Sequence, residues 1–214
     1  HAIIQVQPDG QNCIFLYGGS NQAVTPEDID AVLSHFAPGD YLLMQNELSN
    51  FTYLLRAAVG RGLRVVLNAS PISGEVLAAD LTGVDWLVVN EIECAAIAGC
   101  STPEEGYAAL RARYPGLGIL LTLGSEGSVS WKDGTEVRQC AYPVKAVDTT
   151  GAGDTFMGAC LSFVSDRGLD FSCEELDNAV RFASCAAAIV TTRKGAIESM
   201  PEKDEVMALL NEWK

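Results

Sequence analysis

The stretch Asp148-Thr149-Thr150-Gly151-Ala152-Gly153-Asp154-Thr155-Phe156 follows a short apolar run and opens an amphipathic helix that we expect over about 151–165. Gly151 and Gly153 let backbone N–H groups approach a ligand without a Cβ in the way. Because these N–H groups lie where a helix begins, they lack partners along the helix and are positively polarised. The stretch therefore predicts an anion-binding site suited to a phosphate group.

Asp154 lies within this predicted site. A carboxylate among phosphate-binding amides is electrostatically unfavourable unless it has a function. Beside a bound phosphate group, it can accept the proton of an attacking hydroxyl. A structural explanation is also open, in which Asp148 caps the helix and Asp154 is a first-turn acid favoured by the helix dipole.

The composition limits the class of protein. The chain has 214 residues, 48% of them hydrophobic, enough for one large domain or one domain with an appendage. Its formal net charge of −14 argues against binding to nucleic acid or to an anionic membrane. No apolar run is long enough to cross a bilayer and no signal peptide opens the sequence, so we expect a cytoplasmic protein. Because the chain as a whole is acidic, a bound phosphate group must be attracted by local positive potential, such as that of helix ends, a divalent cation and a few basic residues.

The cysteines and histidines narrow the chemistry further. The seven cysteines form no C-x-x-C pair, and most lie in apolar segments. This pattern is typical of reduced, buried thiols rather than of zinc ligands or a disulfide framework. The sequence has two histidines, His1 and His35, which argues against a histidine-based triad or a multi-histidine metal site.

Strand-like and helix-like segments alternate along most of the chain. Strands are expected at 41–45, 63–67, 86–89 and 118–123, and helices from Thr25, at 49–60, 73–79, 90–98, 103–114, 151–165, 174–191 and 203–213. This alternation predicts an α/β fold whose mostly parallel sheet is covered on both faces. Hairpins are expected at 2–17, around Pro8-Asp9-Gly10, and at 129–140, around Asp133-Gly134.

Polar motifs follow several of these strands, at the sheet edge where α/β folds bind ligands. They are Glu47, Asn90-Glu91-Ile92-Glu93, Thr122-Leu123-Gly124-Ser125-Glu126-Gly127, and the small-residue segment from Arg181 to Ala196. Each also has a structural explanation. Glu47 fits a solvated loop acid, Asn90 with Glu93 fits a helix capping box, and the loop and the small residues fit an ordinary turn and close packing.

These motifs together resemble those of the ribokinase-like (PfkB) carbohydrate kinases. The stretch 148–156 is similar to the family signature, and the other motifs resemble its N-x-x-E, T-L-G-x-x-G and A-A-x-x-x-T-R-K-G-A segments. The resemblance implies a three-layer αβα Rossmann-like fold with a mostly parallel central sheet and a remnant of a β lid. It implies a partial lid hairpin at 1–22 and a nucleotide-binding and catalytic domain at 23–214.

The resemblance also implies residue roles. Gly151, Ala152 and Gly153 would form the anion hole, Asp154 would be the catalytic base beside the sugar, and Glu47 would bind the sugar. The nucleotide would contact Asn90, Thr122, Leu123, Gly124, Ser125, Glu126, Gly127, Gly153 and Ser184. Asn90 and Glu93 would hold Mg²⁺ through water. A monovalent cation, K⁺, would be held by Asp148, Thr150, Val190, Arg193, Gly195 and Ser199, several of them through carbonyl oxygens.

The implied activity is ATP-dependent phosphorylation of a sugar hydroxyl, with D-ribose as the expected sugar and a homodimer through the lid strands compatible with it. Deoxyribose, fructose or a nucleoside remain alternatives. Family members carry a further N-terminal segment that includes sheet strands and sugar-binding motifs, so we expect a truncated chain. A non-catalytic nucleotide-binding fragment is therefore also open. The segment 166–177 is longer than in close family members, and Ser184 replaces a more basic residue seen in some.

Overall fold

The computed structural model describes residues 1–6, 12–164 and 172–212, which form two compact units. The first unit comprises residues 1–5 and 13–121. The second comprises residues 6 and 12 and the described residues from 122 onward. The boundary that we place between residues 22 and 23 from the sequence stays a prediction.

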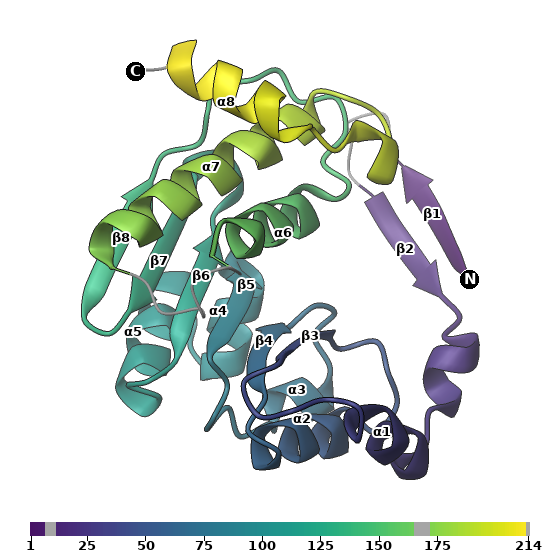
Figure 1. Cartoon of the computed structure of the whole chain (residues 1–214). Coiled ribbons are helices and arrows are strands. Elements are labelled where there is room, and N and C mark those ends of the chain that lie inside the picture. The colour runs from purple at the N-terminus through teal and green to yellow at the C-terminus, as the bar shows by residue number, and fades with distance from the viewer. Residues whose placement is uncertain (7–11, 165–171, 213–214) are drawn as a thin grey trace. The chain divides into compact units, whose positions relative to one another are not determined.

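The first unit alternates strands with helices, as the sequence predicts (Figure 1). Its elements are β1 (Ala2–Val6), β2 (Asn12–Leu16), the 3-10 helix η1 (Gly19–Ala23), α1 (Pro26–Leu33), β3 (Tyr41–Gln45), α2 (Phe51–Gly60), β4 (Arg64–Asn68), α3 (Gly74–Leu77), β5 (Trp86–Asn90), α4 (Glu91–Ala98), α5 (Pro103–Arg113) and β6 (Gly118–Thr122). Strands β3, β4, β5 and β6 are neighbours in that order, and the pairs β3–β4 and β4–β5 are parallel.

The central strands of this unit are buried on both faces. The adjacent residues Val65 and Val66 of β4, whose side chains point to opposite faces, are 0% and 2% exposed, and Leu87 of β5 is 0% exposed. Such strands are continuous apolar runs because helices cover both sides of a parallel sheet. A Cβ at Gly118, the first residue of β6, would lie 2.5 Å from the ring of Trp86, so the absence of a side chain there lets the buried indole pack against the backbone.

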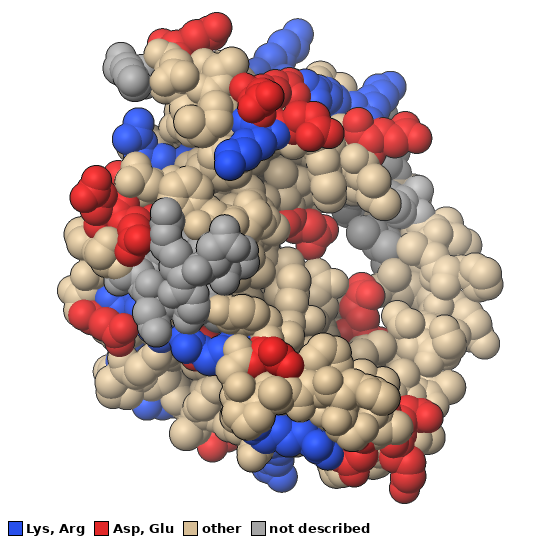
Figure 2. Space-filling view, viewed as in Figure 1, with Lys and Arg blue, Asp and Glu red and all other residues tan. Residues whose placement is uncertain are grey.

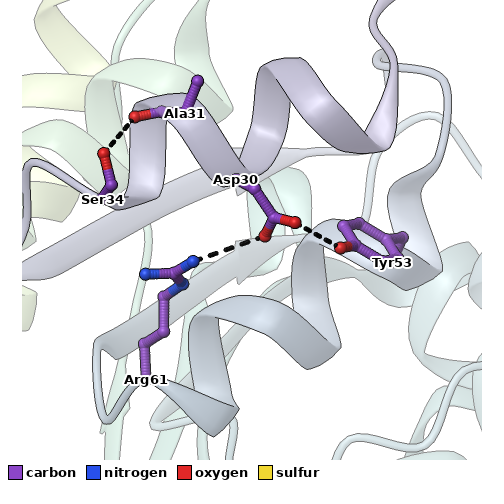
Figure 3. Close-up of polar contacts among 5 residues, drawn as sticks. All are labelled: Asp30, Ala31, Ser34, Tyr53 and Arg61. Atoms are coloured by element: carbon purple, nitrogen blue, oxygen red, sulfur yellow. Dashed lines mark hydrogen bonds and ion pairs between the residues drawn. The ribbon is translucent and has the colours of Figure 1, made fainter.

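Helix α1 is fixed to α2 by a small polar cluster (Figure 3). Asp30 of α1 accepts a hydrogen bond from the Tyr53 hydroxyl at 2.8 Å, and it forms an ion pair with Arg61 at 3.4 Å. The bond to Asp30 raises the pKa of Tyr53 above its ordinary value. The start of α1 is set by a capping box between Thr25 and Asp28. Exposed ion pairs of this kind contribute little stability, so the cluster mainly fixes the orientation of α1 on α2.

The second unit contains η2 (Gly124–Glu126), β7 (Ser128–Lys132), β8 (Thr135–Gln139), α6 (Ala152–Val164), α7 (Cys173–Thr191), η4 (Ile197–Ser199) and α8 (Lys203–Glu212). Strands β7 and β8 are antiparallel, with Ser130 opposite Val137. Helices α6 and α7 lie side by side (Figure 1). Phe182, Cys185 and Ile189 of α7 pack in a core with Tyr142 and with Val206 of α8.

The predicted strands and helices are confirmed to within about two residues at most ends, and this includes the short helix α3, which is narrower than the predicted 73–79. Among the described 3-10 helices, η1 and η4 are not predicted, whereas η2 lies in the turn expected at 124–127. The predicted turn Pro8-Asp9-Gly10 and residues 166–171 of the long segment lie outside the described residues. No helix in the described ranges combines the length and the apolar character needed to cross a membrane. Acidic and basic side chains are interspersed over the face drawn in Figure 2.

The prediction of buried thiols is confirmed for only some of the cysteines. Cys94, Cys160 and Cys185 are buried, and burial raises the pKa of Cys160 to about 12 and that of Cys185 to about 11. The prediction is wrong for Cys13, Cys140 and Cys173, which are exposed. Each of these three cysteines has at least one polar neighbour in the sequence, so a nearby apolar residue is not a guide to the burial of the thiol itself.

The first prediction concerns the close approach of α4 and α5. A Cβ at Gly106 of α5 would lie 2.8 Å from the carbonyl oxygen of Cys94 and 3.0 Å from the Cα of Ala95. Because backbone atoms cannot move aside cheaply, we expect Gly106→Ala to lower the free energy of unfolding by about 1–3 kcal/mol, despite the better helix propensity of alanine. Denaturation in urea, followed by circular dichroism, measures the change.

The matched control is Gly158→Ala in the middle of α6, where a Cβ meets no atom within 4 Å. We expect this variant to be more stable by about 0.4–1 kcal/mol, because alanine restricts the unfolded chain and favours the helix. A Gly106→Ala variant as stable as the Gly158→Ala variant would contradict the close approach.

Candidate functional site

The loop after β6 is a tight turn that requires glycine. The Leu123 N–H donates to the Gly127 carbonyl at 2.8 Å, and the Gly127 N–H donates to the Gly124 carbonyl at 3.2 Å. Gly127 has φ +103°, and a Cβ there would lie 2.0 Å from the carbonyl oxygen of Gln139. The left-handed backbone and the close approach both exclude other residues. The predicted T-L-G-x-x-G loop is thus built against the end of β8.

The glycine-rich stretch leads directly into α6. Gly151 has φ +78°, and the Thr155 N–H donates to its carbonyl at 2.8 Å, which closes the first turn. The Ala152 N–H is engaged by the Thr149 carbonyl at 3.2 Å. For the amides of Gly151 and Gly153 we find no hydrogen-bond partner within the described part of the chain. These two N–H groups can therefore donate to an anion at the start of α6.

Asp148 does not cap α6, so the structural explanation offered for it from the sequence is wrong. Its carboxylate accepts hydrogen bonds from the Thr150 N–H at 2.9 Å and from the Gly195 N–H at 3.0 Å. The hydrogen bond from the Thr150 side chain, followed by the Gly195 amide, holds the pKa of Asp148 below its ordinary value. Asp148 thus joins the glycine-rich stretch to the turn that follows α7.

Asp154 lies in the first turn of α6 and is exposed. Its position agrees with the structural explanation of a first-turn acid that the helix dipole favours. It is also next in sequence to Gly153, whose amide faces the start of the helix. An exposed carboxylate at this place is accessible to a substrate hydroxyl, and its role as a base stays a prediction.

The residues expected to hold a monovalent cation are connected by hydrogen bonds in the second unit. The Arg193 N–H donates to the Val190 carbonyl at 3.2 Å, and the Ser199 hydroxyl donates to the Gly195 carbonyl. The Arg193 guanidinium, expected to be available for a phosphate or a carboxylate, forms an ion pair with Glu205. The carbonyl and hydroxyl oxygens gathered here are ligands that a hard cation accepts. Cation binding itself stays a prediction.

A cavity of about 470 Å³ opens beside these segments in the second unit. Its size is within the range of small-molecule sites. The wall consists of Thr122, Gly124, Ser125, Gly127, Ser128, Ala141, Tyr142, Pro143, Val144, Ala146, Thr149, Ala152, Gly153, Phe156, Ser184, Ala187, Ala188 and Thr191. It therefore unites the predicted loop, the start of α6 and the small residues of α7. Leu123 and Glu126 belong to the loop but do not line the cavity.

Two buried hydroxyls in this wall have no partner. Ser184 is 8% exposed and Ser128 is 3% exposed, and neither Oγ has a hydrogen-bond partner among the described residues. An unpaired buried hydroxyl costs about 1–3 kcal/mol, so a polar ligand in the cavity would offset that cost. Sequence reasoning identifies Ser184 and misses Ser128. The strand β7 has the sequence Ser-Val-Ser-Trp-Lys, and this pattern does not single out Ser128 from Ser130.

The remaining predicted residues lie in the first unit. The Asn90 side chain accepts from the Glu93 N–H at 2.9 Å, and the Glu93 carboxylate accepts from the Asn90 N–H at 2.9 Å. The capping-box explanation is confirmed, and a role beside Mg²⁺ stays a prediction. Glu47 is exposed, and its carbonyl accepts from Gln22 at 3.0 Å. Within the described ranges, no cluster of three or more His, Cys, Asp or Glu side chains could hold a metal ion.

Comparison with known proteins places these motifs in context. A family model described as pfkB family carbohydrate kinase matches residues 1–203. The chain is 33% identical over 214 residues to the ribokinase of Staphylococcus aureus (strain COL), with 96% of this chain and 67% of that protein covered. The solved ribokinase of Thermotoga maritima is similar with a TM-score of 0.78 at 31% identity, covering 98% of this chain and 69% of that one.

The structure of Arabidopsis thaliana ribokinase complexed with ribose and ATP is similar with a TM-score of 0.72 at 32% identity. It covers 98% of this chain and 68% of that chain. The chain thus spans about two thirds of the length of these relatives. The likeness confirms the expected α/β fold with a mostly parallel central sheet.

A prediction follows from the hydrogen bonds of Asp148. Because its pKa is lowered on folding, the stability that it contributes is present above the unfolded value of about 3.8 and is lost as the pH falls through the folded pKa. We expect Asp148→Asn to be less stable than the wild type at pH 7, and the difference to shrink in acid.

NMR titration of the carboxyl group checks this directly. The midpoint for Asp148 should lie below 3.8, and Thr150→Val should raise it, because the Thr150 side chain is the largest cause of the shift. A midpoint at or above 3.8 in the wild-type chain would contradict the two hydrogen bonds.

Proposed function

The chain belongs to the pfkB family of carbohydrate kinases, and from this premise we propose that it acts in ATP-dependent phosphorylation of D-ribose to ribose 5-phosphate. The observation that carries the proposal is the cavity of the second unit, whose wall includes Gly153 at the start of α6 and the glycine loop at Gly124 and Gly127. A helix start supplies donors to a phosphate group, and an adjoining cavity accommodates the rest of a nucleotide.

The fit of a nucleotide to this cavity rests on the residues present. Phe156 and several alanines give an apolar wall against which a flat ring packs, and the unpaired Ser184 hydroxyl offers a polar atom. The relative from Arabidopsis thaliana, described as complexed with ribose and ATP, supports the same choice of ligands. We therefore assign the base to the cavity and the phosphates to the amides at the start of α6.

The reaction assigns a separate role to each residue of this stretch. Asp154 accepts the proton of the sugar hydroxyl on a carboxylate oxygen while the hydroxyl oxygen forms a bond to the γ-phosphorus and the bond to ADP breaks. The amides of Gly151 and Gly153 donate to the transferring phosphoryl oxygens, where negative charge accumulates. The Ala152 N–H, expected from the sequence to share this role, is engaged by the Thr149 carbonyl at 3.2 Å and joins them only if that bond is exchanged for the phosphate. Glu47 binds the sugar.

Two cations would assist this chemistry. Asn90 and Glu93 would hold waters of Mg²⁺, which neutralises phosphate charge when bound. The oxygens around Asp148, Thr150 and Gly195, together with Ser199 and the carbonyls of Val190 and Arg193, would hold K⁺. The arrangement suits a hard cation because the donors are oxygens already ordered by hydrogen bonds.

Two alternatives remain distinguishable by experiment. The first alternative is another acceptor, since 2-deoxyribose, fructose and nucleosides present a comparable primary hydroxyl. A panel of these acceptors with Mg·ATP separates them. A chain that binds Mg·ATP without turning over any acceptor would instead be a nucleotide-binding fragment.

We also propose that the sheet of β1 and β2 contacts a second copy of the chain. Ile3, Phe15 and Leu16 of this sheet are 69%, 59% and 60% exposed, and His1 and Tyr17 exchange two backbone hydrogen bonds of 2.8 Å at its end. Exposed apolar side chains on a short sheet favour pairing with a partner. Sedimentation of the wild type and of Phe15→Ser distinguishes a dimer from a monomer.

The test of the proposed base is Asp154→Asn. We expect phosphoryl transfer to fall by about 10²–10⁴-fold, because an amide cannot accept the proton, while the affinity for Mg·ATP changes little. Coupled measurement of ADP release, with calorimetric titration of Mg·ATP, gives both quantities.

The matched control is Asp204→Asn, which removes an acid from the first turn of α8 rather than of α6. It should lose a comparable helix-dipole interaction and keep full turnover. Turnover of Asp154→Asn at the wild-type rate would show that Asp154 is only a first-turn acid.

A further inference from the structure

The polar side chains in the wall of the cavity are all of one chemical kind. They are the hydroxyls of Thr122, Ser125, Ser128, Tyr142, Thr149, Ser184 and Thr191. The other lining residues are Gly, Ala, Pro, Val and Phe. Among the described residues that line the cavity there is thus no carboxylate, amide, imidazole, ammonium or guanidinium group.

This uniformity has a consequence for recognition of a base. A hydroxyl both donates and accepts and rotates to suit its partner, whereas a carboxylate accepts only, and an amide presents its donor and acceptor in a fixed order. Adenine presents an amino donor where guanine presents a carbonyl acceptor, so the same edge of the two bases has opposite hydrogen-bonding polarity. A wall of hydroxyls matches either edge and therefore does not separate the two bases.

Many backbone N–H and C=O groups of the wall are already hydrogen-bonded within the protein and are not available to a ligand. The Gly127 N–H donates to Gly124 at 3.2 Å, and the Gly127 carbonyl accepts from Leu123 at 2.8 Å. Ser128 lies within the β7–β8 hairpin, and Pro143 has no N–H. The lining residues of α7 lie within a helix that runs from Cys173 to Thr191. Among the side chains of the wall, the hydroxyls are thus the polar groups that can meet a ligand, beside the backbone groups of the segment 141–146.

Two of the buried hydroxyls in this wall have no competing protein partner. Tyr142 is engaged by the side chain of Arg181, and the Thr191 hydroxyl donates to the Ala188 carbonyl at 2.7 Å. The hydroxyls of Ser128 and Ser184 are unpaired, and a turn about one side-chain bond redirects each of them. They are therefore the groups most able to adjust to the edge of whichever base is bound.

We propose that this cavity takes purine nucleoside triphosphates as a class, guanine and hypoxanthine nucleotides as well as ATP. The phosphate donor is then selected by the shape of the apolar wall and by its phosphates, not by the edge of its base. The inference rests on the proposed function, because it concerns the same nucleotide site.

The test is calorimetric titration of the chain with Mg·ATP, Mg·GTP and Mg·ITP under identical salt conditions. We expect the three dissociation constants to lie within about tenfold of one another, because no side chain of fixed hydrogen-bonding sense lines the cavity. Tight binding of ATP with GTP more than tenfold weaker would overturn the inference and leave the proposed function standing. Binding of none of the three by a folded chain would overturn the proposed function itself.

Serine variants show whether the hydroxyls act as described. Ser184→Ala and Ser128→Ala should each weaken binding of both ATP and GTP by about 3- to 10-fold, because one adjustable hydrogen bond is lost to either base. The ratio of the ATP and GTP affinities should stay within about threefold of the wild-type ratio. A variant that changes this ratio more than tenfold would overturn the inference, since the hydroxyl of that serine would then discriminate between adenine and guanine.

The matched control is Ser130→Ala. Ser130 lies two residues along β7 from Ser128, is 0% exposed and has an equally unpaired hydroxyl, but it does not line the cavity. Its alanine variant should bind ATP and GTP as the wild type does. Weakened binding in Ser130→Ala that matches Ser128→Ala would mean that the loss comes from packing, and would overturn the role of the Ser128 hydroxyl. Circular dichroism of each variant verifies that it is folded.

Discussion

The second unit depends on one carboxylate that makes two hydrogen bonds to separate segments. Asp148 accepts from Thr150 within its own turn and from Gly195, 47 positions further along the chain. The N–H groups of Val147 and Asp148 also donate to the Thr191 carbonyl at 2.7 and 3.1 Å. The residues that precede α6 are therefore hydrogen-bonded at several points to the end of α7 and to the turn after it. This attachment places the start of α6 beside the cavity, because residues of both helices line it.

Close backbone approach is the second constraint, and it explains why glycines recur around the cavity. At Gly127 a side chain would overlap the end of β8, and at Gly151 a Cβ would lie 3.3 Å from that of Ala196. Both residues have positive φ angles, which glycine adopts without strain. The turn at Gly127 and the turn before α6 can thus come close to their neighbours without a side chain narrowing the cavity. The absence of a side chain at these glycines also leaves backbone N–H groups accessible to a ligand.

The sequence predicts the strand and helix order well because apolar periodicity and caps act locally. The Asn90 capping box is one example, since both of its partners lie within four residues. It predicts the cavity only in part. Gly124, Gly153 and Ser184 belong to motifs, whereas Ser128 and Tyr142 line the cavity because β7 and the segment after β8 pack where they do. Such tertiary proximity leaves no periodic signal. The same limit explains the exposed Cys140, whose neighbours Ala141 and Tyr142 suggest burial.

The high negative charge of the chain is compatible with a phosphate site because the relevant charges are local. A net charge of −14 is spread over the whole sequence, and at physiological salt charges beyond about 8 Å are largely screened. The Arg193 guanidinium is already paired with Glu205, and the Asp148 carboxylate is negatively charged, with two amide N–H groups donating to it. Apart from Lys194, whose charge also acts on Asp148, the local attraction for an anion therefore comes from oriented amides at the helix start, which do not titrate. A site built on amides binds phosphate over a wide pH range, which suits a cavity wall whose own side chains carry no charge.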